Sequence, residues 1–350
     1  MERVRVGLIG ASVRRGWGMS AHVPALTHLP ELELTAVCTA HSETARESAE
    51  AFGARLAFSD YREIIQSPEV DAVTIAVRVP WHKEIALAAA AAGKHVYCEW
   101  PLAVTVEDGE AMQVAADAAG VQHMVGLQGR AAPWARYLHD LVSGGELGEI
   151  IAVNASSFTT HNYMRADTHW AAKRAAGNHL LSIQVGHMLD MLESMLGPLT
   201  GLKSRIGTRV TPWLIEGLEP IEADAPDHVL ISGQFASGGI ASLHSAYVPV
   251  TPGAWRLEIY GDRGAVRASA SGPSHVATMR LERGQPGASA MEPISVPAEY
   301  SEVPDAVPQG APFHVAHLYR RFARAILSGE PAEPSFADGV RRLKSLDALG

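Results

Sequence analysis

Apolar and polar residues alternate in short segments over the first 128 residues of the chain. Runs rich in valine, isoleucine and leucine are separated by alanine-rich segments with helical periodicity, a pattern typical of parallel strands joined by crossover helices. Thr105 suits the N-cap of one such helix, and Gly93 the C-terminal end of another. Strands are predicted at 3–10, 32–40, 71–77, 94–99 and 121–128, with helices at 82–93 and 105–120.

The pattern changes after about residue 150. Longer β-rich runs carry hairpin signals such as Ser-Gly-Gly and Gly-Asp-Arg-Gly, which indicate a mostly antiparallel sheet. A segment with helical spacing ends at Gly197, and two amphipathic helices close the chain. The predicted fold class is therefore an α/β domain with a doubly wound parallel sheet, followed by an α+β domain with a large, mostly antiparallel sheet. The β-rich runs lie at 149–158, 227–247 and 255–270, and the helices at 178–196, 314–329 and 336–350.

Composition narrows the classes of function. The chain has 350 residues, 47% of them apolar, which favours two domains over one. Its formal charge of −9 argues against a nucleic-acid partner, because such binding depends on clustered Lys and Arg. The first residues lack the apolar run of a signal peptide or membrane span, so we expect a cytoplasmic protein with no membrane partner.

Neither the cysteines nor the histidines suggest a metal. Cys38 and Cys98 sit in apolar runs without metal-ligand spacing, so both are expected to be small buried residues. His169, His179 and His187 are regularly spaced but span a loop and a helix, and the chain lacks an HExxH motif. No metal site is predicted.

A glycine-rich turn joins the first predicted strand to the first helix. Gly10 and Gly16 lie in "GLIGASVRRGWG", where glycine permits a tight turn and close approach of a pyrophosphate to backbone amides. The turn is longer than GxGxxG, and Ser12 stands at the second glycine position. Its place in a strand–turn–helix unit favours dinucleotide binding over a structural turn. We therefore predict a dinucleotide-binding Rossmann domain at 1–129, a substrate and oligomerisation domain at 130–312, and C-terminal helices at 313–350 that pack back on the first domain.

The identity of the dinucleotide is suggested by the end of the second strand. The ribose-binding acid typical of NAD enzymes is missing there, where the sequence has Thr39, His41 and Ser42. Arg14 and Arg15 are placed to reach a 2′-phosphate, which favours NADP over NAD. The alternative is that both arginines are solvated loop charges.

Three segments together resemble the Gfo/Idh/MocA oxidoreductase family: "VGLIGA…HVPAL", "RVPWHKEIALAAAAAGKHVYCEWPLA" and "GHMLD". The chain is most similar to the branch that contains the fungal galactose-pathway repressor and its bacterial relatives. That branch shares Gly16-Trp17, the Glu99-Trp100 pair, "LQGR" at 127–130, and His187 with Asp190. The typical family tripeptide is Glu-Lys-Pro, and here Trp100 stands at the lysine position between Glu99 and Pro101.

The resemblance implies roles for specific residues. His187 is expected to exchange the substrate proton, and Asp190 to orient the His187 ring. Lys173 is a candidate substitute for the missing lysine. Trp100 cannot relay a proton, because its indole only donates a hydrogen bond. Trp100, Tyr163, His169 and Trp170 are predicted to contact substrate. Cofactor contacts are predicted for Gly10, Ser12, Arg14, Arg15, Gly16, Trp17, Thr39, His41, Ser42, Val79, Pro80, His82, Glu99, Trp100, Pro101 and Gln128.

Two functions follow from these residues. The first is an NAD(P)-dependent oxidoreductase that moves a hydride to or from a hydroxyl or carbonyl of a sugar, polyol or related small molecule. The alternative is a non-catalytic, dinucleotide-binding regulator like the galactose-pathway repressor, which would also need a protein partner. The antiparallel sheet offers a flat face, so we expect a homodimer or higher homo-oligomer.

Overall fold

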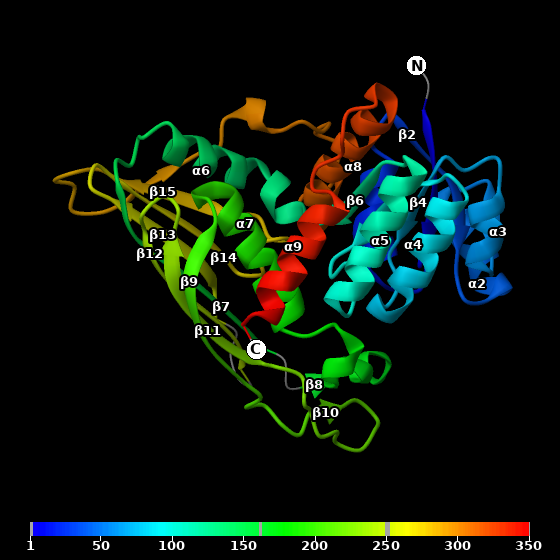
Figure 1. The fold of residues 1–350 in the computed structure, drawn as a ribbon, viewed down its shortest axis with the longest axis horizontal. Helices are drawn as coiled ribbons and strands as arrows, with labels where there is room; N and C mark the ends of the chain where they lie inside the picture. The colour runs from blue at the N-terminus through cyan, green and yellow to red at the C-terminus, as the bar shows by residue number, and fades with distance from the viewer. Residues whose placement is uncertain (1–2, 161–162, 249–252, 350) are drawn as a thin grey trace. The chain divides into compact units, whose positions relative to one another are not determined.

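The computed structural model describes residues 3–160, 163–248 and 253–349 (Figure 1). The chain forms two compact units, one made of residues 1–128 and 302–344 and the other of residues 129–301 and 345–350. We call them the N-terminal domain and the C-terminal domain. The division lies one residue before the predicted boundary at 129, and the N-terminal domain takes back a segment that begins at 302 rather than 313.

The N-terminal domain is built on a six-stranded parallel sheet of order β3-β2-β1-β4-β5-β6. All four residues of β4 are buried, as expected for a strand covered on both faces. The predicted doubly wound sheet is confirmed, and β3 was not anticipated. The strands are β1 (Val4–Ile9), β2 (Leu32–Cys38), β3 (Leu56–Phe58), β4 (Ala72–Ile75), β5 (His95–Glu99) and β6 (His123–Gly126).

Helices cover both faces of this sheet. The first begins as a π-helix, η1 (Gly18–His22), and continues as α1 (Val23–Leu26). Figure 1 shows α4 and α5 side by side. Thr105 Oγ1 accepts the Asp108 N–H, and Gly93 has a φ of 70°, so both predicted helix ends are confirmed. The other helices are α2 (Ser42–Phe52), α3 (Tyr61–Gln66), η2 (Val79–Trp81), α4 (His82–Ala91), α5 (Val106–Ala119), α8 (Ala311–Ser328) and most of α9 (Phe336–Asp347).

Helix α8 belongs to the core of the N-terminal domain. Its apolar face places Tyr319 and Phe322 fully inside. Tyr319 stacks on Tyr97 of β5 with ring centroids 4.9 Å apart, and Phe322 meets the same ring edge-on at 6.1 Å. Aromatic pairs in these geometries add to the free energy gained by burial. The amphipathic pattern at 314–329 therefore marked a core helix.

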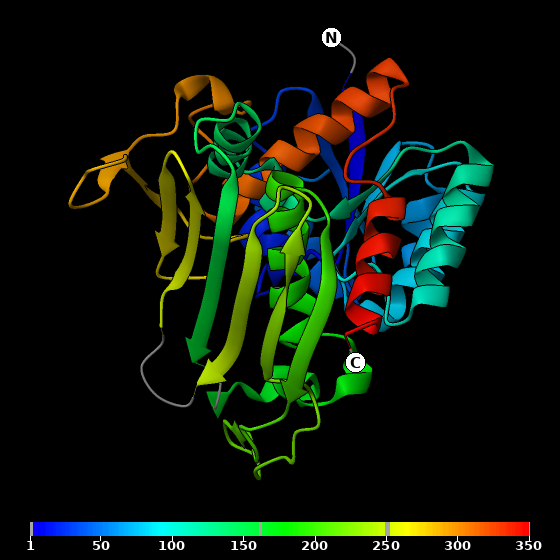
Figure 2. The same cartoon turned by 60° about the vertical axis from the view of Figure 1, so that its left-hand side comes forward.

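The C-terminal domain is built on an eight-stranded sheet of order β16-β15-β14-β13-β7-β12-β11-β9. All neighbours are antiparallel except β7 and β12, so the prediction of a mostly antiparallel sheet is confirmed. Figure 2 shows its long strands side by side. They are β7 (Ile150–Thr160), β9 (Leu199–Gly207), β11 (His228–Phe235), β12 (Ile240–Val248), β13 (Trp255–Gly261), β14 (Ala265–Ala270), β15 (Arg280–Gly284) and β16 (Glu292–Ile294).

One face of this sheet is buried. Along β11 and β12 buried and accessible residues alternate, which is the period expected when one face meets the core. Trp134 of α6 packs edge-on against Trp255 of β13, with ring centroids 5.7 Å apart. The helical elements are η3 (Gln128–Ala131), α6 (Pro133–Ser143), η4 (Ala166–Ala172), η5 (Arg174–Ala176), η6 (Leu181–Val185), α7 (Gly186–Leu196) and η7 (Ala298–Tyr300). A small parallel sheet pairs β8 (Tyr163–Met164) with β10 (Leu214–Ile215).

Three histidines of the C-terminal domain are buried: His179, His187 and His275. Burial lowers the pKa of His179 to about 4, helped by the charge of Arg174 and opposed by that of Asp224. Burial also lowers the pKa of His275 to about 4. The imidazoles are therefore neutral in the folded protein near neutral pH, whereas in the unfolded chain they titrate near their ordinary value of about 6.5.

We predict that replacing Phe322 with alanine lowers the free energy of unfolding of the N-terminal domain by about 3–5 kcal/mol, since it opens a cavity in the core. The matched control is Leu327→Ala in the same helix, where the leucine is 48% exposed and the expected loss is under about 1 kcal/mol. Urea unfolding of both variants measures the difference. Equal losses would contradict the placement of α8.

We predict that the free energy of unfolding falls as the pH is lowered from about 6.5 toward 4. In this range the histidines bind protons in the unfolded chain but stay neutral when they are buried in the folded protein. Each such group contributes a slope of up to about 1.4 kcal/mol per pH unit. Thermal unfolding of wild type and His275→Phe across this range measures the effect, and the variant should lose less.

Candidate functional site

The glycine turn between β1 and η1 excludes a side chain at Gly10 and Gly18. Gly10 has a φ of 99°, and a Cβ there would clash with the backbone oxygen of Ala76 at the end of the neighbouring strand. A Cβ on Gly18 would lie 2.7 Å from the Gly10 oxygen. Gly16 and its neighbours form the exposed crest of the loop. A turn whose glycines leave backbone amides accessible before a helix fits the pyrophosphate of a dinucleotide.

The other residues of this loop have internal contacts. Ser12 Oγ accepts the Arg14 N–H at 3.2 Å, and the Val13 N–H donates to Ser48 of α2 at 2.9 Å. Trp17 is half-buried, and its ring meets His22 edge-on. These contacts tie the loop to η1 and α2, so both neighbouring helices hold the loop in place.

Arg14 has a partner that the sequence did not reveal. Its guanidinium donates to both carboxylate oxygens of Glu47 in α2 at 3.1–3.3 Å. At the end of β2, Thr39 Oγ1 donates to the His41 carbonyl, and His41 and Ser42 are exposed at the start of α2. Glu47 therefore brings a negative charge to the place where Arg14 was predicted to receive a 2′-phosphate.

The turn after β4 is fastened to the turn after β5 by His82. His82 is fully buried, with Nδ1 3.0 Å from the Pro101 carbonyl and Nε2 3.0 Å from the Val77 carbonyl. Burial lowers its pKa, so the ring is neutral and one nitrogen donates at a time. The prediction that His82 contacts the cofactor needs correction, because both nitrogens face backbone carbonyls. Val79 is buried in η2, and Pro80 of the same turn is exposed.

Glu99 is held by a buried chain of polar contacts. Its carboxylate oxygen Oε1 lies 3.0 Å from His22 Nε2, and His22 Nδ1 is 2.7 Å from the Tyr319 hydroxyl. That hydroxyl lies 2.9 Å from Thr74 Oγ1 of β4. A Cβ on Gly126 would lie 2.7 Å from the same carboxylate, which explains the glycine. Glu99 thus faces the interior, contrary to its predicted contact with the cofactor.

Trp100 and Gln128 lie at the carboxyl ends of neighbouring strands. Trp100 is 4% exposed and joined to Pro101 by a cis peptide bond. Gln128 is fully buried, and neither its Oε1 nor its Nε2 has a hydrogen-bond partner among the described residues. Buried amides are rarely left unpaired, so Gln128 indicates a missing ligand or water. In parallel sheets this edge forms the ligand crevice.

His187 is the second residue of α7 and follows the π-helical turn η6. Single π-helical turns often occur at functional sites. Gln184 in η6 accepts hydrogen bonds from Ser157 at 3.3 Å and Thr159 at 3.2 Å, which fixes this turn to β7. His187 is buried, and its Nδ1 has no hydrogen-bond partner in the described structure.

Asp190 does not orient His187 as predicted. The Arg130 guanidinium holds both of its oxygens, with Nε 2.8 Å from Oδ2 and Nη2 on Oδ1. Asp190 is 2% exposed, so this bidentate pair compensates a buried charge. Arg130 was not among the predicted site residues, although it and Asp190 both lie in recognisable motifs. "LQGR" ends in this arginine, and "GHMLD" ends in its aspartate partner.

His187 stacks on His275 instead. The two rings are nearly parallel, at 8°, with centroids 3.9 Å apart. Burial first, and the charge of His275 second, lower the pKa of His187 well below its usual range. A neutral imidazole can accept a proton, but the lowered pKa makes His187 a weaker base than an exposed histidine. The sequence held no signal for His275, because it lies 88 positions away in an irregular loop.

The predicted substrate residues are dispersed around η4 and η5. Figure 1 shows this region next to the small β8–β10 sheet. Lys173 is exposed, and its amine donates to the Glu222 carbonyl at 2.7 Å. The structure gives this amine a backbone partner, which argues against Lys173 as the substitute lysine. His169 is exposed and bonded to the Ala166 carbonyl, Trp170 is half-buried, and the Tyr163 side chain lies outside the described residues.

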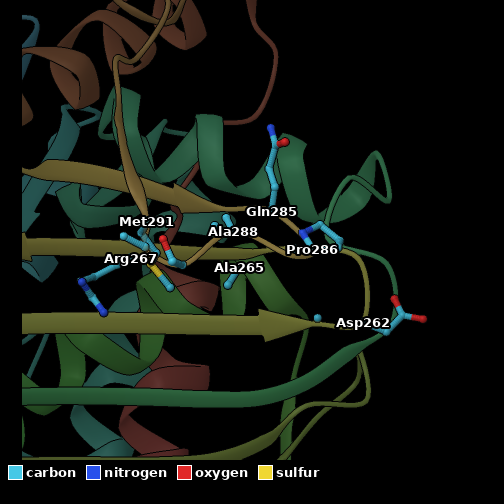
Figure 3. A pocket seen from close by; sticks show the side chains of 12 residues that line it. Asp262, Ala265, Arg267, Gln285, Pro286, Ala288 and Met291 are labelled. Atoms are coloured by element: carbon cyan, nitrogen blue, oxygen red, sulfur yellow. The ribbon is translucent and has the colours of Figure 1, made fainter.

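A depression of about 420 Å³ lies elsewhere in the C-terminal domain, between the β13–β14 and β15–β16 turns (Figure 3). None of the predicted site residues lines it. Its Arg267 is paired with Glu258 at 3.0 Å, and its Asp262 accepts the Glu149 N–H at 2.9 Å. We therefore do not place the functional site there.

The described part of the chain shows neither a cluster of metal ligands nor a membrane-spanning helix. Its His, Cys, Asp and Glu side chains form no group of three or more that would hold a metal ion. Within the same residues, none of the helices is long and apolar enough to cross a membrane.

Comparison with known proteins gives relatives of two kinds, dehydrogenases and a regulatory protein. The dehydrogenase aclE of Aspergillus oryzae is 29% identical over 288 residues, 78% of either chain. Levoglucosan dehydrogenase of Pseudarthrobacter phenanthrenivorans is 28% identical over 268 residues, 70% of this chain and 68% of that protein. The galactose/lactose metabolism regulatory protein GAL80 of Saccharomyces cerevisiae is 25% identical over 259 residues, 68% of this chain and 59% of that protein.

Solved structures show the same two kinds. Levoglucosan dehydrogenase in complex with NADH and L-sorbose superposes with a TM-score of 0.84 at 25% identity, covering 100% of this chain and 96% of that one. A super-repressor mutant of Gal80p from Saccharomyces cerevisiae superposes with a TM-score of 0.87 at 18% identity. The match covers 99% of this chain and 95% of that one, which shows a shared fold. Residues 4–127 match the oxidoreductase family with an NAD-binding Rossmann fold, and residues 135–267 match its GFO/IDH/MocA C-terminal domain. Because both domain models match in this order, the chain belongs to the GFO/IDH/MocA oxidoreductase family.

Proposed function

We propose that the protein is an NAD(H)-dependent oxidoreductase acting on a hydroxyl or carbonyl group of a sugar, polyol or related small molecule. The observation that carries the proposal is His187, buried and neutral at the start of α7, with an unpartnered ring nitrogen. Levoglucosan dehydrogenase and the 1,5-anhydro-D-fructose reductase of Ensifer adhaerens, 31% identical over 247 residues, support a sugar-like substrate.

A bound nicotinamide supplies the hydride acceptor or donor at its C4 atom. When the substrate alcohol is oxidised, its carbon gives up the hydride and its hydroxyl proton passes to the neutral imidazole of His187. When a carbonyl is reduced, protonated His187 returns that proton to the new alkoxide oxygen. Burial keeps water away from the imidazole and so favours the neutral form between turnovers.

The missing family lysine is the main argument for the alternative function. Trp100 occupies its position, and Lys173 is engaged with Glu222. In the proposed enzyme His187 alone exchanges the proton, and the Trp100 indole contributes an apolar wall or a stacking surface for a sugar ring. In the alternative, the protein binds the dinucleotide without turnover and acts as a regulator. The relative GAL80 is named a regulatory protein of galactose and lactose metabolism.

The cofactor is proposed to be NAD(H) rather than NADP(H). The sequence favoured NADP because Arg14 and Arg15 suited a 2′-phosphate. In the structure the Arg14 guanidinium is already paired with Glu47, so a 2′-phosphate would have to displace or face that carboxylate. A homodimer or higher homo-oligomer and a cytoplasmic location stay predictions.

We predict that the purified protein reduces NAD⁺ with at least one member of a panel of sugars, anhydrosugars and polyols. His187→Gln should lower kcat by at least about a hundredfold, the usual contribution of general acid–base catalysis, while the Kd for NADH stays within about threefold. His139→Gln, at an exposed histidine of α6, is the matched control and should keep wild-type turnover. Tight NADH binding without turnover of any substrate would favour the regulator instead.

We predict that Glu47→Gln shifts the ratio of NADPH to NADH affinity toward NADPH by about three- to tenfold, because the released Arg14 can pair with a 2′-phosphate. Glu43→Gln removes the same charge one turn earlier on α2 and is the control. Calorimetric titration of both variants with both nucleotides measures the ratio. Equal shifts in the two variants would show that overall charge, and not the Arg14–Glu47 pair, sets the preference.

A further inference from the structure

The His187 ring has a ring partner from a distant part of the chain. His275 lies in the loop between β14 and β15, and its imidazole covers one face of His187 at a centroid distance of 3.9 Å and an angle of 8°. His275 is 9% exposed and His187 4% exposed. The second torsion of a histidine side chain has a broad energy well, so stacking on one face restricts a rotation that the bond itself leaves loose.

The loop holds His275 in a defined place. The Val276 and Ala277 N–H groups both donate to the Pro273 carbonyl, at 3.1 and 3.0 Å, which closes a tight turn around His275. The preceding residue, Ser274, is buried as well. The imidazole is therefore presented by an ordered turn, and this turn is what covers His187.

Other charged groups on the neighbouring elements have partners of their own. On α7, Asp190 is paired with Arg130, and Glu193 accepts the Leu199 N–H at 3.1 Å. On α6, which packs against α7, Arg136 donates to the Tyr300 carbonyl and Asp140 accepts from the Tyr300 hydroxyl. Among the described residues, His275 is the ionisable group whose charge acts on His187.

We propose that His275 is a positioning residue for proton exchange by His187: face-to-face stacking fixes the plane of the His187 ring and keeps water off that face. The inference rests on the proposed function, since it assigns His275 a part in the same reaction. His275 acts through His187 and has no proton transfer of its own. An aromatic ring of any kind at position 275 meets this requirement, and a side chain without a ring does not.

The test compares His275→Ala, which removes the ring, with His275→Phe, which keeps a flat ring but cannot ionise. His275→Ala should lower kcat by about tenfold or more, because the reacting group is no longer held in orientation. His275→Phe should stay within about twofold of wild type. The control is His244→Ala, which removes a half-buried histidine of β12 that contacts Phe158, and it should match wild type.

The second readout is the pKa of His187, measured by ¹⁵N-histidine NMR titration and by the acid limb of the kcat/KM profile for alcohol oxidation. In His275→Ala both water entry and loss of the neighbouring charge raise this pKa, by about one unit or more, so the acid limb moves to higher pH. In His275→Phe only the charge is lost, and the rise should be smaller. If His275 served folding alone, kcat and the pKa of His187 would not change more in His275→Ala than in His275→Phe.

The outcomes are distinct. An active enzyme in which His275→Ala keeps both wild-type kcat and the wild-type pKa of His187 overturns the inference, as does His275→Phe with the defect of His275→Ala. Absence of turnover in wild type means that the proposed function fails, and the inference with it. If His275→Ala does not fold, as judged by thermal unfolding and NADH binding, His275→Gln takes its place with the same expected defect.

Discussion

The buried contact between Glu99 and His22 is the constraint on which the N-terminal domain depends. A carboxylate inside a protein core costs several kcal/mol unless a partner compensates it. Here the partner is an imidazole from η1, itself backed by Tyr319 of α8 and Thr74 of β4. The chain of contacts joins η1 after the glycine turn, the end of β5, and helix α8. Removing any member leaves a buried polar group without its partner.

This network explains why an acid precedes Trp100. Glu99 is directed inward, where it anchors the end of β5 next to Gly126 of β6. His82 makes a second link, from the turn after β4 to the Pro101 carbonyl. The position of Trp100 is thus determined by its two neighbours and by His82. At the centre of this turn stands an indole, at the position where the sequence comparison with the Glu-Lys-Pro tripeptide expected an amine.

The C-terminal domain handles its buried ionisable groups in another way. Asp190 keeps its charge and is compensated by Arg130, whereas His187 and His275 are kept neutral by burial. Helix α7 therefore contributes Asp190 to a charged pair and His187 to a neutral pair. The charged pair fixes α7 to η3, and the neutral pair leaves a ring nitrogen of His187 available. Strongly shifted pKa values of this kind cluster at functional sites.

The sequence by itself determined the two domain types, the order of most strands and the glycine turn, because these depend on local periodicity and backbone freedom. It also made His187 a candidate, because His187 lies within the "GHMLD" motif. Only the tertiary structure decided the partners: Glu47 for Arg14, Arg130 for Asp190, His22 for Glu99 and His275 for His187. Side chains from distant positions meet only when the strands have paired. The state of each ionisable group then depends on those neighbours and on burial, neither of which a single sequence displays.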